Sequence, residues 1–298
     1  MIKVGIYGPE QIDSPKRKQL LRLLLRHPDV DLRAVASPAG NAVPLAELHP
    51  VYAGETKLTL ERELRIDNLD VLFVIDESNL TNEILAKYEN DPEFRLILLG
   101  DCPKTLREKS GLVYGFPEYK RKELVRGARG ACSPTPEALL IELALFPLAK
   151  KGLVEAPVDI ELASARQNGA DAAAEARAIL TELQGTLNVP IKAADKPQPP
   201  FDRIDLHATM DCPLAIDEVH RIYEEAYEDH NFTYVVTGRE GIDEDLRGSN
   251  KCLIQLYAEG NKLHVRASID ALTRGVTGNA VHIMNLLFGL YERTGLSI

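Results

Sequence analysis

The sequence predicts an α/β fold, with a doubly wound, mostly parallel sheet first and an α+β part with a mainly antiparallel sheet after it. Up to about residue 130, short apolar runs alternate with helical patterns, which is typical of βαβ units around a parallel sheet. Later strands alternate polar and apolar residues, as in a sheet with one solvated face. The 298 residues suffice for two domains, each with its own core.

The first βαβ unit occupies residues 1–37. Residues 3–7 form an apolar run typical of a buried strand, and Gly8 opens the loop that follows. Ser14 is expected to cap a helix that has Pro15 at its first position. The buried stripe of this helix is Leu20, Leu21, Leu23, Leu24 and Leu25. Residues 31–37 are the second strand, which completes the unit.

The remaining elements follow from the same periodicities. Strands are expected at 71–75 and 95–99, with a helix at 82–88 between them. The second part is expected to contain helices at 136–146, 171–183 and 216–228, strands at 158–162 and 204–210, antiparallel strands at 233–236, 251–258 and 262–269, and a final helix at 277–290. Residues 188–201 are rich in proline and are expected to form a loop or an extended crossing, and Gly260-Asn261 is expected to form a hairpin turn. The expected domains are 1–132 completed by 277–298, and 133–276.

Composition excludes several classes of protein. The net charge is −10 and no long basic run occurs, which argues against nucleic acid and anionic membranes as partners. The four cysteines, Cys102, Cys132, Cys212 and Cys252, show no CxxC pairing, so neither a zinc site nor a disulfide framework is expected. No apolar run approaches the length of a membrane span, and the first residues read as a strand and not as a signal peptide. These features predict a cytoplasmic protein without a metal.

Cys132 is the candidate nucleophile. It stands just before the long apolar helix pattern that begins at Pro136. The positive end of a helix dipole and its free N–H groups favour the thiolate, which is the attacking form of cysteine. The alternative for such a cysteine is a small buried residue at a strand–helix junction.

Six segments, in order along nearly the whole chain, carry a family resemblance: residues 20–28, 44–50, 114–118, 132–135, 246–252 and 278–290. Residues 114–118 resemble a Tyr-Gly-Leu-Pro-Glu motif, and residues 132–135 resemble a catalytic Cys-Tyr-Pro-Thr motif. Together they resemble the N-acetyl-gamma-glutamyl-phosphate reductases of arginine biosynthesis. These are relatives of aspartate-semialdehyde dehydrogenase and glyceraldehyde-phosphate dehydrogenase. The resemblance implies a Rossmann-like first domain.

The resemblance also implies a reaction. A thiolate at Cys132 would displace phosphate from an N-acyl-glutamyl phosphate, and NADPH would reduce the thioester to the semialdehyde. Gly8 and Ser37 match cofactor-binding positions after the first two strands, and Asn285 matches a residue near the nicotinamide in relatives. For Asn285 the alternative is an ordinary polar residue on a buried helix. The resemblance further implies a homodimer or homotetramer formed through the sheet of the second domain.

Two departures from that family concern the cofactor. The glycine-rich turn after the first strand is replaced by residues 8–16, a longer loop that keeps only the first glycine and adds Glu10 and Asp13. The arginine that holds the 2′-phosphate of NADP is replaced by Pro38. The third apolar run, 71–75, is followed by Asp76 and Glu77, which place further negative charge at the expected dinucleotide site.

A third departure concerns the chemistry. The family's histidine that serves as acid and base is absent from residues 166–175, and His207 is the best substitute in the sequence. Three functions therefore remain open. They are a divergent NADPH-dependent reductase, a family member without cofactor binding that acts as an interaction or regulatory protein, and a thiol-dependent acyl transferase or hydrolase. The reductase is the first of these because Cys132 stands where the family requires it.

Overall fold

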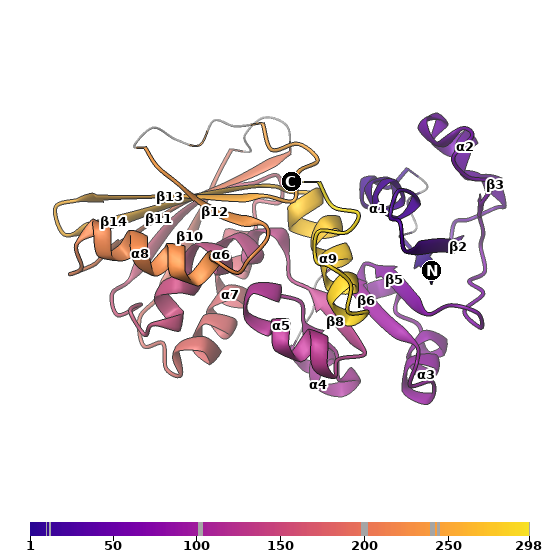
Figure 1. Cartoon of the computed structure of the whole chain (residues 1–298), viewed down its shortest axis with the longest axis horizontal. Helices are drawn as coiled ribbons and strands as arrows, with labels where there is room; N and C mark the ends of the chain where they lie inside the picture. The colour runs from indigo at the N-terminus through magenta and orange to yellow at the C-terminus, as the bar shows by residue number, and fades with distance from the viewer. Residues whose placement is uncertain are drawn as a thin grey trace. The chain divides into compact units, whose positions relative to one another are not determined.

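Two units make up the chain. A computed structural model describes residues 1–9, 11, 13–100, 104–197, 202–238, 242 and 245–297. The first unit comprises Met1–Pro134 and Val276–Ser297, and the second comprises Thr135–Gly275. Each is described here by itself. Figure 1 shows the chain as a ribbon with its elements labelled.

A parallel sheet of six strands is the centre of the first unit. Its order is β2-β1-β5-β6-β8-β7, and every pairing is parallel. The strands are β1 (Ile2–Tyr7), β2 (Val30–Ala36), β5 (Val71–Ile75), β6 (Arg95–Leu99), β7 (Val113–Tyr114) and β8 (Gly130–Ser133). The chain runs from β1 outward to β2 and then returns to β5 on the other side of β1. The sheet is therefore doubly wound, with its topological switch point between β1 and β5.

The other elements of this unit connect the strands. They are α1 (Pro15–Leu25), β3 (Val43–Pro44), α2 (Leu45–Leu48), η1 (Pro50–Tyr52), β4 (Thr59–Leu60), η2 (Glu77–Asn79), α3 (Asn82–Asn90), α4 (Lys104–Ser110), α5 (Pro117–Arg126) and α9 (Gly278–Leu287). Helix α1 begins as the sequence predicts, because Ser14 accepts a hydrogen bond from the Arg17 N–H and Pro15 occupies the first position. Helix α9 follows a π-helical turn, η3 (Thr273–Thr277), and ends three residues earlier than expected.

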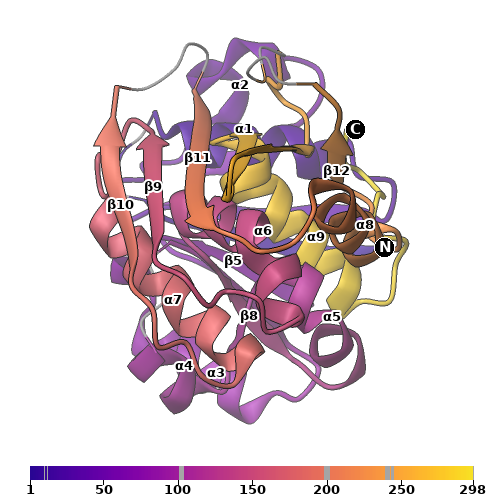
Figure 2. The ribbon, with the colours of Figure 1, turned by 90° about the vertical axis from the view of Figure 1, so that its left-hand side faces the viewer.

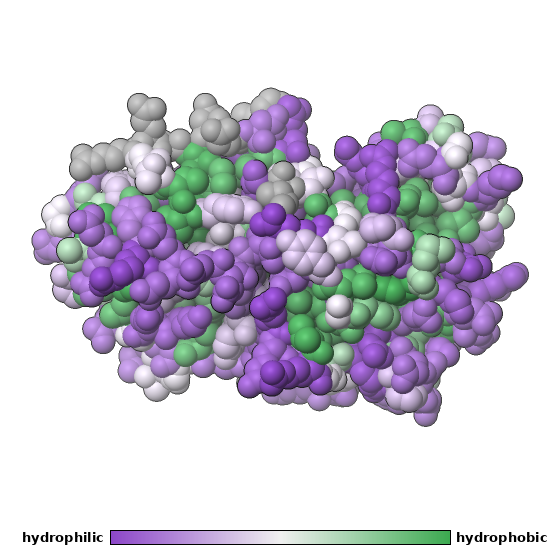
Figure 3. Space-filling model, viewed as in Figure 1, coloured by the Kyte–Doolittle hydropathy of each residue, from purple (hydrophilic) through white to green (hydrophobic). Residues whose placement is uncertain are grey.

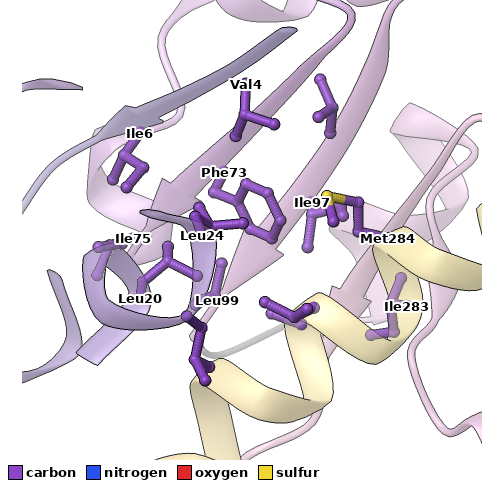
Figure 4. Close-up of a cluster of buried hydrophobic side chains, with 14 of the residues drawn as sticks. Val4, Ile6, Leu20, Leu24, Phe73, Ile75, Ile97, Leu99, Ile283 and Met284 are labelled. Carbon is purple, nitrogen blue, oxygen red and sulfur yellow. The ribbon is translucent and has the colours of Figure 1, made fainter. Parts of the chain in front are cut away.

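Apolar side chains cover both faces of the parallel sheet. On one face, residues of α1 and α9 pack against residues of β1, β5 and β6. Figure 4 labels ten residues of this cluster, from the helices and the strands together. On the other face, Ile84 and Tyr88 of α3 pack with Leu72 and Leu96. All five residues of β5 are buried, because a strand in the middle of a parallel sheet has no solvated face.

A mixed sheet of six strands forms the second unit, in the order β10-β9-β11-β14-β13-β12. The strands are β9 (Val158–Ala163), β10 (Ile191–Lys196), β11 (Arg203–Asp211), β12 (Thr233–Val236), β13 (Cys252–Glu259) and β14 (Lys262–Asp270). Strands β11, β13 and β14 pair antiparallel, and Figure 2 shows β10, β9 and β11 side by side. Gly260 and Asn261 form the expected hairpin turn, since Glu259 pairs with Lys262.

The structure refines one expectation for this sheet and shows another to be wrong. Residues 191–196 form a strand parallel to β9 inside the segment expected to be a loop or an extended crossing. Its residues show no alternation and only Ile191 is buried, so the strand exists because β9 offers an open edge. Strand β12 pairs parallel with β13 and not antiparallel. The direction of a strand depends on its connection to its partner and leaves no trace in its own side chains.

Three helices cover one face of the second sheet: α6 (Pro136–Lys150), α7 (Gly169–Gln184) and α8 (Ile216–Tyr227). Helix α6 is buried along nearly its whole length and touches both other helices and strands β11, β13 and β14. A helix that is apolar all round belongs in a core, and α6 is the central helix of this unit.

The remaining surface features are ordinary. Hydrophilic residues cover most of the face drawn in Figure 3, with hydrophobic residues visible between them. No helix in the described part of the chain combines the length and the apolar character that a membrane crossing demands.

Candidate functional site

Strand β8 carries Cys132, and the segment after β7 fixes its backbone. The N–H of Gly115 donates to the Cys132 carbonyl at 2.7 Å. A Cβ atom at position 115 would lie 2.7 Å from that same oxygen and 2.5 Å from Cδ1 of Ile283. Only glycine permits so close an approach of two backbones. The Tyr-Gly-Phe-Pro-Glu segment is thus a structural partner of the cysteine strand.

Asn279, in the first turn of α9, connects the same two segments. Its fully buried Nδ2 donates to the Gly115 carbonyl and to the Ser133 hydroxyl, both at 3.0 Å. One amide therefore ties the C-terminal helix to the residue next to Cys132. Asn279 was not among the residues predicted from the sequence, although it lies with Asn285 in segment 278–290 that carries the resemblance.

The sulfur of Cys132 is not a thiolate in this structure. The residue is fully buried and disulfide-bonded, and the other half of the disulfide is not among the described residues. Cys132 lies inside β8, and α6 begins only after the N-cap Thr135. The effect of a helix dipole falls off within the first turn. The support of a helix N-terminus for the Cys132 thiolate stays a prediction for the reduced protein, and the disulfide departs from the expectation that the chain has no disulfide framework.

Two carboxylates lie near the start of α6, and the sequence analysis missed both. Glu175 on α7 accepts from the N–H of Thr135 at 3.2 Å and from its hydroxyl at 2.6 Å. Glu137 is almost fully buried, and its Oε2 has no hydrogen-bond partner among the described residues. Burial raises the pKa of Glu137, and Arg166, with Nη1 at 3.9 Å, opposes this only in part. The available signal was a glutamate in an otherwise apolar run.

His207, the expected substitute for the missing histidine, lies on β11 of the second unit. Its Nε2 is 3.0 Å from Nδ1 of His264 and 3.2 Å from the hydroxyl of Tyr257. Burial lowers the pKa of His207, and the charge of Arg266 lowers it further. Both effects disfavour the protonated imidazole, and a role of His207 as acid or base stays a prediction.

Arg17 holds the loop between β1 and α1 from within. Its fully buried guanidinium donates to the carbonyls of Gly8, Pro9 and Gln11 at 3.4, 3.3 and 2.9 Å. The N–H of Gly8 donates to the Ala36 carbonyl at 2.9 Å. A phosphate at such a loop needs N–H donors directed toward it. In this loop at least three carbonyls instead accept hydrogen bonds from Arg17 of helix α1. Glu10, one of the two added acidic residues, lies outside the described residues.

Gly8 and Ser37, two of the expected cofactor residues, come together at this loop. Ser37 is fully buried, and its hydroxyl donates to the Pro9 carbonyl at 2.7 Å. Its N–H donates to the Glu61 carbonyl at 2.9 Å. Gly8 has a φ of +79°, and a Cβ there would lie 2.7 Å from the Ile75 carbonyl. Both residues have structural reasons for their identity, and their contact with a cofactor stays a prediction.

Asn285 is engaged elsewhere in the first unit. Its Nδ2 donates to the carbonyls of Glu292 and Thr294 at 3.0 and 2.9 Å, and its Oδ1 pairs with His27 at 3.0 Å. These three bonds use both amide hydrogens and the oxygen, which matches the alternative of a polar residue on a buried helix. Contact of Asn285 with a nicotinamide stays a prediction.

An ion pair spans the switch point of the parallel sheet. Lys16, the second residue of α1, lies with its Nζ 2.5 Å from Oδ1 of Asp76, the residue that follows β5. Ligands of doubly wound sheets bind in this crevice at the carboxyl ends of the strands. Lys16, one of the cations in the first turn of α1, is thus paired with a carboxylate. Asp76 departs from the family, and the sequence analysis identified its charge but not its partner.

The curated relatives of the chain are reductases. It is 30% identical to the N-acetyl-gamma-glutamyl-phosphate reductase of Parabacteroides distasonis over 329 residues, covering 100% of this chain and 98% of that protein. The enzyme of the same name from Bacteroides thetaiotaomicron is 29% identical, with coverage of 100% and 98%. No family model matches the chain.

Solved structures show the same fold. Aspartate semialdehyde dehydrogenase II of Vibrio cholerae, complexed with ASA, superposes with a TM-score of 0.72 at 12% identity, covering 98% of this chain and 99% of that one. Aspartate semialdehyde dehydrogenase with NADP from Candida albicans gives 0.70 at 13% identity, covering 97% and 98%. These likenesses confirm the predicted fold class.

Proposed function

The chain belongs to the N-acetyl-gamma-glutamyl-phosphate reductase family, and on that premise we propose that it reduces an N-acyl-glutamyl phosphate to the semialdehyde through a thioester on Cys132. One observation supports this most directly. The strand of Cys132 is held by Gly115 at the Cys132 carbonyl and by Asn279 at the Ser133 hydroxyl. Both partners lie in segments that resemble the family. We extend the proposal to arginine biosynthesis, cytoplasmic location and a homodimer or homotetramer.

The first chemical step involves only the protein and the acyl phosphate. The Cys132 thiolate attacks the carbonyl carbon, the bond from that carbon to the phosphate oxygen breaks, and inorganic phosphate leaves with the electron pair. The step requires a reduced sulfur, so the disulfide of Cys132 must first be opened by an external thiol. Asn279 and Gly115 position the strand and act only through it.

The cofactor site departs from what a dinucleotide requires. A nicotinamide dinucleotide would supply hydride, and NADP is the one that the family and the Candida albicans structure suggest. The residues at the switch point do not fit it. The β1–α1 loop gives its carbonyls to Arg17, the N–H of Gly8 is used, and Asp76 neutralises Lys16.

The same observation favours a second function. A family member whose dinucleotide crevice is occupied by its own ion pair would act as an interaction or regulatory protein. The Lys16–Asp76 pair and the Arg17 contacts favour it specifically, because both use groups that a pyrophosphate would need.

A titration separates the two functions. Reduced protein is titrated with NADPH and, in parallel, NADH by calorimetry, and turnover is followed in reverse with N-acetylglutamate semialdehyde, phosphate and NADP. The reductase proposal expects saturable binding and turnover that Cys132→Ser abolishes. Cys212→Ser, at a partly exposed free cysteine, is the matched control and should keep both. Absence of binding at millimolar cofactor would overturn the reductase and leave the second function.

A further inference from the structure

The pair formed by Lys16 and Asp76 lies where the phosphates of a dinucleotide would enter. Strands β1 and β5 are neighbours, with Tyr7 opposite Val74, and the two charged residues lie just beyond their carboxyl ends. Lys16 is on the first turn of α1, and Asp76 is the residue directly after β5. The ion pair therefore joins the two sides of the switch-point crevice.

The first turn of α1 offers few other groups to an anion. Pro15 has no N–H, the Arg17 N–H donates to the Ser14 hydroxyl at 3.3 Å, and the Lys18 N–H donates to the Ser14 carbonyl at 2.9 Å. Helix N-termini usually bind phosphate through these N–H groups. Arg17 is directed toward the loop carbonyls, whereas the ammonium of Lys16 extends to the end of β5, where it pairs with Asp76. Lys16 is therefore the cation of this turn that is shown to reach the crevice.

Asp76 is held in place by its backbone. Its φ is +66°, its N–H donates to the Leu99 carbonyl at 2.7 Å, and its carbonyl accepts from Asn79 at 3.1 Å. The carboxylate is thereby fixed beside Lys16. Side chains of the pair remain 33% and 38% exposed, so solvent and salt reach it. An exposed pair of this kind is weak and can exchange partners.

We propose that Asp76 sets the affinity of the crevice for dinucleotide phosphates by competing with them for Lys16. This inference rests on the proposed function in one respect, because it takes the nicotinamide dinucleotide as the ligand. A phosphate group that enters must displace the carboxylate from the ammonium, and it also meets the negative charge of the displaced carboxylate. Both effects weaken binding in the native chain.

The substitution Asp76→Asn tests the proposal. Asparagine tolerates the left-handed backbone and keeps the size of the side chain, but removes the charge. NADPH should bind at least about tenfold more tightly than to the native chain, a modest effect for one unit charge at a partly exposed site. Glu77→Gln, at the exposed neighbouring carboxylate, is the matched control and should change the affinity by less than about twofold.

Lys16→Gln completes a double-mutant cycle. The gain from Asp76→Asn should vanish in the double variant, because no ammonium is left to bind phosphate. Inorganic pyrophosphate serves as a second probe, since it reports phosphate binding without any contribution from nicotinamide. Asp76→Gly replaces Asp76→Asn should the latter fold poorly, and thermal unfolding with circular dichroism checks each variant.

The outcomes separate this inference from the proposed function. Tighter binding of NADPH by Asp76→Asn than by the native chain supports the inference. A native chain that neither binds NADPH nor turns over overturns the reductase function, but it leaves this comparison valid. Native-like affinity of Asp76→Asn for both NADPH and pyrophosphate would overturn the inference, and turnover by the native chain would leave the function intact. An equal gain in Glu77→Gln would also overturn it, because the effect would then be one of net charge.

Discussion

Gly115→Ala tests whether the cysteine strand is held as the structure indicates. The added methyl carbon would lie 2.7 Å from the Cys132 carbonyl oxygen and 2.5 Å from Cδ1 of Ile283. The isoleucine can move by changing its rotamer, but the carbonyl belongs to strand β8 and is hydrogen-bonded to the N–H of Gly115 itself. The substitution must therefore push the Gly115 backbone away from β8.

The magnitude follows from two effects. Overpacking of a well-packed core costs about 1–3 kcal/mol. Loss or stretching of the hydrogen bond from Gly115 to Cys132 costs about 1 kcal/mol more. We expect Gly115→Ala to lower the free energy of unfolding by about 2–4 kcal/mol, measured as a lower urea midpoint at unchanged slope.

The control for this measurement is Gly127→Ala. A Cβ at position 127 meets nothing within 4 Å, and the φ of −178° lies outside the left-handed region that favours glycine. This variant should stay within about 0.5 kcal/mol of the native protein. Equal urea midpoints for Gly115→Ala and Gly127→Ala would refute the close approach of the two segments and, with it, the argument that residues 114–118 position Cys132.

Three further predictions use the same methods. Gly8→Ala should cost about 1–3 kcal/mol in urea unfolding, because alanine strains at a φ of +79° and its methyl would meet the Ile75 carbonyl; a midpoint equal to that of the native protein contradicts this. Burial raises the pKa of Glu137, so the folded state binds the proton of the Glu137 carboxyl more tightly than the unfolded state does. The protonated carboxyl therefore contributes stability below its pKa in the unfolded chain, and this contribution is lost as the pH rises through its pKa in the folded protein. Glu137→Gln cannot ionise and should gain stability relative to the native protein between about pH 4 and pH 8, near and above an ordinary carboxyl pKa; a constant difference in urea midpoint across that range contradicts the shift. Finally, iodoacetamide added to the urea-unfolded protein should label Cys132 only after treatment with a reductant, because its sulfur is disulfide-bonded, whereas the free Cys212 should be labelled without it. Peptide mass spectrometry that finds Cys132 labelled in the unfolded protein without reductant would show that its sulfur is a free thiol.

Local sequence was sufficient for much of the first unit. The bounds of β5 and β6 agree with the sequence prediction because a continuous apolar run between loops has one stable environment, the middle of a covered sheet. The start of α1 was equally predictable, since Ser14 and Pro15 act on the backbone within one turn. Strand β10 could not be found in the same way, because its edge position depends on β9, about thirty residues earlier.

The candidate site likewise contains features that the sequence showed and features that only the structure showed. The cysteine, the glycine of the first loop and the departures from the family could all be recognised in the sequence. Their partners could not. Asn279 and Asn285 are amides on one helix, and only their neighbours show that the first contacts the cysteine strand while the second binds the C-terminal turn.

The sequence by itself determined the fold class, the family and the position of Cys132, because each depends on patterns that are local or colinear along the chain. The tertiary structure decided what the charged residues do. Lys16 and Asp76 are sixty residues apart, and the charge of each could have favoured or opposed a phosphate. Their effect on an anion depends on the distance between them, and the folded sheet sets that distance by bringing the ends of β1 and β5 together.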